Sequence, residues 1–237
     1  YYFPAGSYSR GWLSQPGSLM VLDSADHRPG VFRVLDTQVH GAHSRWLDVA
    51  GRSARTAPSG SIWAVIETRG VVVRDFDEEI AVWPATRGKR ARELLAVGAK
   101  GDVLVQMEHD GSLELLRVGH AATPLERCQG EGRSESPSYE TAAFHVRVPV
   151  VVARTREHHH EMWNTTTGRC IASVRDRRMD KLIFAGSNDG EYVLSRDRTR
   201  LSIWRVGEDI GLKEEMALSV HQAGISDFDV DTASGTL

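Results

Sequence analysis

The sequence has few cysteines and no long hydrophobic run. Its 237 residues include only Cys128 and Cys170. Small secreted domains that depend on disulfides are rich in cysteine, so we expect no disulfide framework here and a reducing compartment. No apolar segment approaches the ~20 residues that a membrane-spanning helix needs, and the first residues lack the charged and apolar regions of a signal peptide. We therefore expect an intracellular protein, either cytoplasmic or nuclear.

Net charge and helical periodicity are also lacking. The formal net charge is −3 at pH 7, so no overall field favours nucleic acid or membranes, and an argument from charge must concern a local patch. Instead of long amphipathic segments, short runs rich in β-branched residues, such as SIWAVIE and VLVQM, alternate with turn sequences such as AKGD and NDGE. These features predict an all-β protein with many short strands.

A repeat of about 40 residues organises these strands. In its clearest copy, residues 181–206, the strands KLIFAGS, YVLSRD and LSIWRV are joined by the turns NDGE and RTR. Trp204 lies in the third strand of this copy, and the corresponding residues of the other copies are Trp163, Leu116, Arg74 and Leu35. These positions are 41, 47, 42 and 39 residues apart. The longest interval contains a polar insertion at about 128–140 that we expect to be mobile.

The repeat resembles that of the WD-repeat β-propeller family. IWRV and MWNTTTGRC are similar to the family's Trp-Asp strand ending and Thr-Gly turn, Asp197 and Asp110 match the aspartate of the preceding turn, and His221 matches its Gly-His histidine. The resemblance implies one propeller domain over residues 1–237, with about five and a half four-stranded blades covered. The 41-residue spacing of Trp163 and Trp204, with matching turns, predicts that they lie on equivalent outer strands of adjacent blades.

The number of repeats bears on the completeness of the ring. One four-stranded sheet cannot bury both of its faces alone, whereas sheets packed around an axis can. The last copy stops after HQAGISDFDVDTASGTL, and a closed ring needs whole blades. We therefore expect the chain to be part of a larger propeller, or one that a missing segment or a partner chain completes.

Three consecutive histidines, His158, His159 and His160, suggest a metal site at first reading. We expect them in the turn between the third and fourth strands of the fourth unit. Because side chains of a strand alternate between its faces, only His158 and His160 share a side, and zinc needs three or four converging ligands. The sequence therefore predicts a partly packed, solvated turn, with no metal and no cofactor.

Candidate catalytic groups lack the partners that catalysis needs. The acidic segment 74–79, RDFDEE, fits a solvated loop between strands better than an acid pair, and Cys128 has no histidine at a motif-defined spacing. The glycine-containing segments GSNDG and GAKGD each join two strands, so neither has the helix N-terminus that binds a phosphate. We expect a protein that is not an enzyme.

Charged loops suggest where a partner binds. In WD-repeat propellers alternate loops lie on opposite faces, and sorting the loops by this rule separates basic segments from the acidic segments 77–79 and 207–215. The predicted partner-binding residues are Arg87, Lys89, Arg90, Arg92, Arg175, Arg177, Arg178, Arg196, Arg198, Arg200, His158 and His160. The alternative is that these are ordinary solvated turns, with Asp176 and Asp197 partly neutralising the arginines.

The resemblance implies a non-catalytic protein-interaction scaffold in an intracellular multiprotein complex, such as a substrate-recognition module. An acidic segment of another protein would suit the basic loops. The alternative is an RNA- or DNA-associated propeller that uses the same face. Base stacking would need aromatic residues among the basic residues, and the basic loops contain none, so the sequence favours a protein partner.

Overall fold

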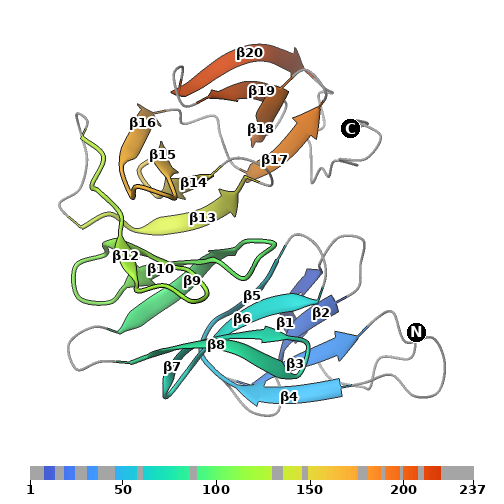
Figure 1. Cartoon of the computed structure of the whole chain (residues 1–237). Coiled ribbons are helices and arrows are strands. Elements are labelled where there is room, and N and C mark those ends of the chain that lie inside the picture. The colour runs from blue at the N-terminus through green and yellow to red at the C-terminus, as the bar shows by residue number, and fades with distance from the viewer. Residues whose placement is uncertain are drawn as a thin grey trace. The chain divides into compact units, whose positions relative to one another are not determined.

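The structure is a computed structural model that describes most of the chain. The described residues are 8–13, 19–24, 31–36, 46–57, 61–85, 90–129, 136–145, 149–175, 181–187, 190–197, 200–207 and 211–219. Side chains are described at residue 21 and at residues 31–35, 47–57, 61–85, 90–129, 136–145 and 149–175. All regular structure in these ranges is β-strand, as the sequence predicts. The chain divides into two compact units, residues 1–123 and 124–237, which are described in turn (Figure 1).

The first unit contains three four-stranded sheets, each built from strands that follow one another along the chain. The first sheet consists of β1 (Tyr8–Leu13), β2 (Leu19–Ser24), β3 (Val31–Asp36) and β4 (Trp46–Ala50). The second consists of β5 (Ala54–Thr56), β6 (Ile62–Glu67), β7 (Gly70–Asp75) and β8 (Glu78–Pro84). The third consists of β9 (Ala91–Val97), β10 (Val103–Met107), β11 (Leu113–Leu116) and β12 (Thr123–Pro124), whose last residue belongs to the second unit.

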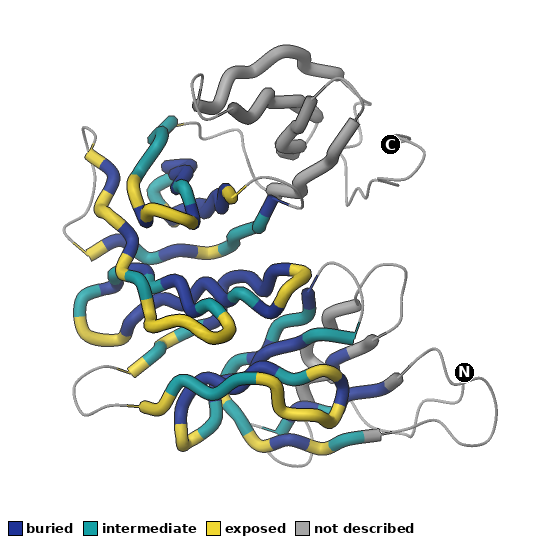
Figure 2. The backbone as a smooth tube through the Cα atoms, viewed as in Figure 1, coloured by how far each residue is buried: buried dark blue, intermediate teal, exposed yellow. Residues whose placement is uncertain are grey.

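Strand alternation explains why the second sheet is buried on both faces. Along β6, Ala64 packs in a cluster with Leu94 and Val103 of the third sheet, whereas its neighbour Val65 packs in a cluster with Phe32 of the first sheet. Successive side chains of a strand point to opposite faces, so each face of this sheet meets a different neighbour. Sheets stacked in this way bury the interior strands, as Figure 2 shows by their dark colour.

A glycine allows the tight β6–β7 turn. Gly70 has φ of 139°, a conformation that residues with a Cβ atom rarely adopt. A Cβ at this position would lie 2.1 Å from the carbonyl oxygen of Trp83 on β8. The turn therefore depends both on the backbone freedom of glycine and on the absence of its side chain.

The second unit contains two further four-stranded sheets. One consists of β13 (Tyr139–Phe144), β14 (Val150–Thr155), β15 (His159–Asn164) and β16 (Cys170–Arg175). The other consists of β17 (Lys181–Ser187), β18 (Gly190–Asp197), β19 (Arg200–Gly207) and β20 (Gly211–Ser219). Every residue of β14 is buried, as is all of β15 except its last residue, so both faces of this part of the sheet are covered.

The structure confirms the repeat and its register. The five residues aligned from the sequence all lie on the third strand of their sheets, Leu35 on β3, Arg74 on β7, Leu116 on β11, Trp163 on β15 and Trp204 on β19. Arg74, Trp163 and Trp204 also lie where the pairing with the fourth strand shifts register. A bulge that recurs between copies in this way marks equivalent positions.

One detail of the sequence prediction is wrong. Trp163 and Trp204 do not lie on outer strands, because β16 and β20 pair beyond β15 and β19 and form the sheet edges. The histidine segment was predicted between the third and fourth strands, but it joins β14 to β15, the second and third strands. The five sheets confirm the predicted four-stranded blades. The sixth copy, at 221–237, lies outside the described residues.

Candidate interaction surface and disulfide-held segment

Three of the predicted basic residues have described side chains, and all three are exposed. Arg90 precedes β9, Arg92 is the second residue of β9, and Arg175 ends β16. The side chains of Arg87, Lys89, Arg177, Arg178, Arg196, Arg198 and Arg200 lie outside the described part of the chain. The structure therefore describes the predicted basic surface at Arg90 and Arg92 in the first unit and at Arg175 in the second.

In the first unit the structure adds two arginines that the sequence did not single out. Arg52 lies just before β5 and donates a hydrogen bond to the carbonyl oxygen of Ala91, which places its guanidinium at the backbone between Arg90 and Arg92. Arg55 of β5 lies 3.5 Å from a carboxylate oxygen of Glu93. We refer to Arg52, Arg55, Arg90 and Arg92 as the β5–β9 arginine cluster. Sorting the loops predicted Arg90 and Arg92 but not Arg52 and Arg55, because β5 and β9 belong to different repeats.

The charges in this cluster are incompletely compensated. Arg52 lies 3.9 Å from Glu108, and both side chains are about half exposed, at 47% and 55%. Neither Arg90 nor Arg92 has an ion-pair partner among the side chains that the structure describes. Arg90 and Arg92 thus carry positive charge that no described carboxylate pairs with, which suits an acidic ligand.

The histidine segment is more buried than the sequence suggests. His160 is 0% exposed and His159 is 4% exposed, so neither is a solvated turn residue, and the prediction that His160 contacts a partner is corrected. His158 is half-buried, has φ of 65° and places Nδ1 3.0 Å from Nη2 of Arg154. Since arginine only donates, Nδ1 accepts this bond.

Two carboxylates of the second sheet, Glu67 and Glu79, form ion pairs with arginines. The carboxylate of Glu79 accepts hydrogen bonds from Arg69, and this contact holds the pKa of Glu79 below its usual range. Arg74 pairs with Glu67 at 3.0 Å and lies 3.6 Å from Glu79. These carboxylates therefore compensate arginines across β6, β7 and β8. Within the described residues, no three His, Cys, Asp or Glu side chains are placed to hold a metal ion.

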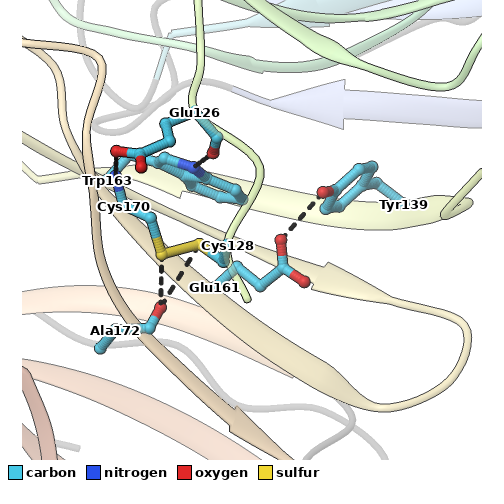
Figure 3. Close-up of a disulfide and its surroundings, with 7 residues drawn as sticks. All are labelled: Glu126, Cys128, Tyr139, Glu161, Trp163, Cys170 and Ala172. Atoms are coloured by element: carbon cyan, nitrogen blue, oxygen red, sulfur yellow. Dashed lines mark hydrogen bonds between the residues drawn. A yellow bond between two sulfur atoms is a disulfide. The ribbon is translucent and has the colours of Figure 1, made fainter. Parts of the chain in front are cut away.

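The two cysteines form a disulfide, contrary to the sequence prediction. The Sγ atoms of Cys128 and Cys170 are 1.99 Å apart, and the Cα atoms are 5.2 Å apart (Figure 3). Cys128 lies in the chain after β12 and is 1% exposed, whereas Cys170 begins β16 and is half-buried. The bond closes a loop with a sequence separation of 42.

Hydrogen bonds hold the same segment to the β15–β16 hairpin. The backbone N–H of Glu126 donates to the carbonyl oxygen of Gly168 at 2.8 Å, and the indole N–H of Trp163 donates to the carbonyl oxygen of Glu126 at 2.7 Å (Figure 3). The backbone N–H of Cys170 donates to the Glu126 carboxylate at 3.4 Å. Residues 125–128, the disulfide-held segment, are thus joined to the hairpin by a covalent bond and by these hydrogen bonds, and Leu125 and Cys128 are buried.

A buried tyrosine–carboxylate pair lies near the disulfide (Figure 3). The hydroxyl of Tyr139 donates to Oε2 of Glu161 at 2.9 Å, and Glu161 is 0% exposed. The Tyr139 ring meets the Trp163 ring edge-on, with centroids 6.2 Å apart. The hydroxyl therefore gives one oxygen of this buried carboxylate a hydrogen-bond donor, which offsets part of the free-energy cost of burying it.

No protein-family model matches the sequence, and no curated protein matches it. In the described part of the chain, no helix is both long and apolar enough to cross a membrane. Solved structures do match the fold. The β-propeller domain of Cps50 (Swd1) from Myceliophteria thermophila matches with a TM-score of 0.62 and 12% identity, covering 92% of this chain and 73% of that one.

Two further structures give a similar match. The WD40 repeats of RRP9 have a TM-score of 0.58 and 12% identity, with 89% of this chain and 66% of that chain covered. NirN, a dihydro-heme d1 dehydrogenase, has a TM-score of 0.60 and 15% identity, with 92% of this chain and 48% of that chain covered. The meandering four-stranded sheets and these matches agree: the chain has the fold of a WD-repeat β-propeller.

Proposed function

We propose that this chain is a non-catalytic scaffold that binds an acidic segment of another protein. The observation that carries the proposal is the β5–β9 arginine cluster, in which Arg90 and Arg92 are exposed and lack an ion-pair partner among the described side chains. Exposed ion pairs contribute only about 0.2–1 kcal/mol each, so several must act together to hold a ligand. An extended acidic segment provides several carboxylates at once.

The second unit offers a smaller contact of the same kind. Arg175 ends β16 opposite His159 in the strand register, so it lies at the end of the sheet where His158 forms the β14–β15 turn. The remaining predicted residues, Arg87, Lys89, Arg177, Arg178, Arg196, Arg198 and Arg200, are proposed as part of the same basic surface.

The fold alone does not decide between a scaffold and an enzyme, because one similar structure is a dehydrogenase. The proposal of a non-catalytic role rests on the side chains themselves. Glu67 and Glu79 of the second sheet pair with arginines, and both cysteines are joined in the disulfide. Neither these two carboxylates nor the cysteines are then available as a free acid or thiol for catalysis.

The proposed setting is an intracellular multiprotein complex, in which the chain would act as a substrate-recognition module. The disulfide bears directly on this setting, because such bonds are rare in reducing compartments. Cells quenched in acid and alkylated before lysis would report the native state of Cys128 and Cys170. A largely reduced pair supports an intracellular location, whereas a fully oxidised pair contradicts it and indicates an oxidising compartment.

Charge reversal tests the proposed binding surface. We expect Arg90→Glu with Arg92→Glu to abolish retention of the partner in pull-downs, and binding by the unaltered chain to weaken steeply as salt rises. The matched control is Asp77→Arg with Glu78→Arg in and beside the β7–β8 turn, at the other end of the strands of the second sheet. Loss of binding in the control pair, with binding retained in the arginine pair, would exclude the cluster.

Nucleic acid is the alternative ligand, and the same pull-downs distinguish it. If a nuclease removes the bound material and the logarithm of the affinity falls linearly with the logarithm of the salt concentration, the partner is RNA or DNA. Material that resists nuclease and is digested by protease supports the protein partner.

A further inference from the structure

The disulfide-held segment combines a buried sulfur with a more accessible one. Cys128 is 1% exposed, while Cys170 is half-buried at the start of the edge strand β16. The carbonyl oxygen of Ala172 lies 3.7 Å from one sulfur and 3.6 Å from the other (Figure 3). An edge strand has no further strand beyond it in its own sheet, so a reductant approaches the bond from the side of Cys170.

We propose that the Cys128–Cys170 disulfide is a redox-controlled clamp, which fastens residues 125–128 to the β15–β16 hairpin when oxidised and releases them when a dithiol reduces it. This inference concerns different residues from the proposed binding surface and does not depend on it.

The exchange reaction balances with a dithiol as the reductant. One thiolate of the dithiol attacks the Cys170 sulfur, which breaks the bond to Cys128 and forms a mixed disulfide, while Cys128 leaves as a thiolate and takes up a proton. The second thiolate of the reductant then attacks the mixed disulfide and releases Cys170, which is protonated in turn. Two electrons pass to the protein, and the reductant becomes a disulfide.

Reduction leaves the segment with weak attachments. The remaining attachments include the burial of Leu125 and the hydrogen bonds of Glu126 with Gly168, with Trp163 and with the N–H of Cys170, the last of which is long at 3.4 Å. A hydrogen bond adds little net stability because water replaces it when the segment opens. The disulfide is the one covalent attachment between the segment and the described hairpin, so its reduction raises how often the segment opens.

Arg127 makes the opening measurable. It lies within the segment, is exposed, and is followed by Cys128, so trypsin cleaves after it only when the backbone leaves the hairpin. The full-length chain would be equilibrated with dithiothreitol or its oxidised form, digested briefly, then denatured, alkylated and analysed by mass spectrometry. We expect cleavage after Arg127 to rise on the order of tenfold or more on reduction, because cleavage follows the population of the open state.

The chain provides its own controls. Arg156 lies in the exposed β14–β15 turn, at the other end of the hairpins from the disulfide, so cleavage after it should not change with redox state. The variant Cys128→Ala with Cys170→Ala should show fast cleavage after Arg127 in both buffers. If this variant fails to fold, the redox titration of the unaltered chain still tests the clamp.

Three results would overturn the proposal. The first is that the cysteines stay reduced in oxidised dithiothreitol. The second is that dithiothreitol fails to reduce the disulfide while the chain is folded. The third is a rate of cleavage after Arg127 that is the same in both buffers. Reversible exchange, with cleavage that follows the fraction reduced, supports it. Partner binding by the arginine cluster is unaffected by any of these outcomes.

Discussion

Removal of the disulfide tests how much of the second unit's stability comes from its crosslink. The crosslink restricts the unfolded chain more than the folded one, and the chain-entropy relation for a sequence separation of 42 gives about 4 kcal/mol at 25 °C. We expect the reduced chain, and the variant Cys128→Ala with Cys170→Ala, to lose about this much free energy of unfolding. Alanine is preferred to serine because a hydroxyl at the buried position of Cys128 would need a hydrogen-bond partner.

Urea denaturation followed by tryptophan fluorescence measures the change. With a denaturant slope of about 2 kcal/mol per molar, a loss of about 4 kcal/mol lowers the midpoint of the affected transition by about 2 M. The slope itself should rise, because an uncrosslinked unfolded chain exposes more surface. The first unit, which contains neither cysteine, serves as the internal control. Midpoints of oxidised and reduced chains that agree within about 0.3 M would show that the crosslink contributes nothing.

Three further predictions concern single substitutions. Gly70→Ala should destabilise the first unit by more than about 2 kcal/mol, because the new Cβ meets the carbonyl oxygen of Trp83 and the backbone has positive φ; an unchanged melting temperature would contradict this. Tyr139→Phe should cost about 1–3 kcal/mol in urea denaturation, because it removes a donor from the buried carboxylate of Glu161; a neutral result would mean that water or another group replaces the hydroxyl. Burial raises the pKa of Asp102, so the folded state binds its proton more readily than the unfolded state, and stability rises as pH falls through the raised pKa. Asp102→Asn should therefore raise the melting temperature at pH 7 but not at pH 3, and a uniform shift would refute this account.

The repeat was predictable because its signal is local. Turn sequences and β-branched runs recur at each copy, and they align Arg74, Leu116, Trp163 and Trp204 on equivalent strands of successive copies. The order of strands within a blade was not predictable to the same degree, since a repeat read from sequence has no marked beginning. The prediction began each blade at the wrong strand, and it therefore placed Trp163 and Trp204 on the edge strand instead of the third strand.

The burial of His160 shows a limit of strand alternation. Alternation separates an exposed face from a buried one only when water covers one face of the sheet. Along β15 both faces are covered, so His159 and His160 are both buried although their side chains point in opposite directions. The sequence indicates which residues share a face, but it does not indicate whether that face is covered.

The disulfide was missed for a different reason. Its formation depends on where the segment after β12 crosses the hairpin of the following sheet, which no local pattern determines. The separation of 42 between Cys128 and Cys170 falls within the range of the repeat intervals. This spacing was the feature of the sequence that could have suggested a pairing of the two cysteines. Cys128 lies in a connecting segment and in no strand, so the repeat interval does not by itself place it beside Cys170.

The 42-residue covalent loop also changes how the chain would respond to mechanical force. A load applied to the two ends of an oxidised chain passes from Cys128 to Cys170 through the sulfur atoms and bypasses β13, β14 and β15, which lie between them. A fully extended chain spans at most about 3.3–3.6 Å per residue, so the bond shields on the order of 140 Å of contour length from extension. In a single-molecule stretching experiment this length would appear only after reduction, and the strands that carry Tyr139, Glu161 and Trp163 would bear no load until then.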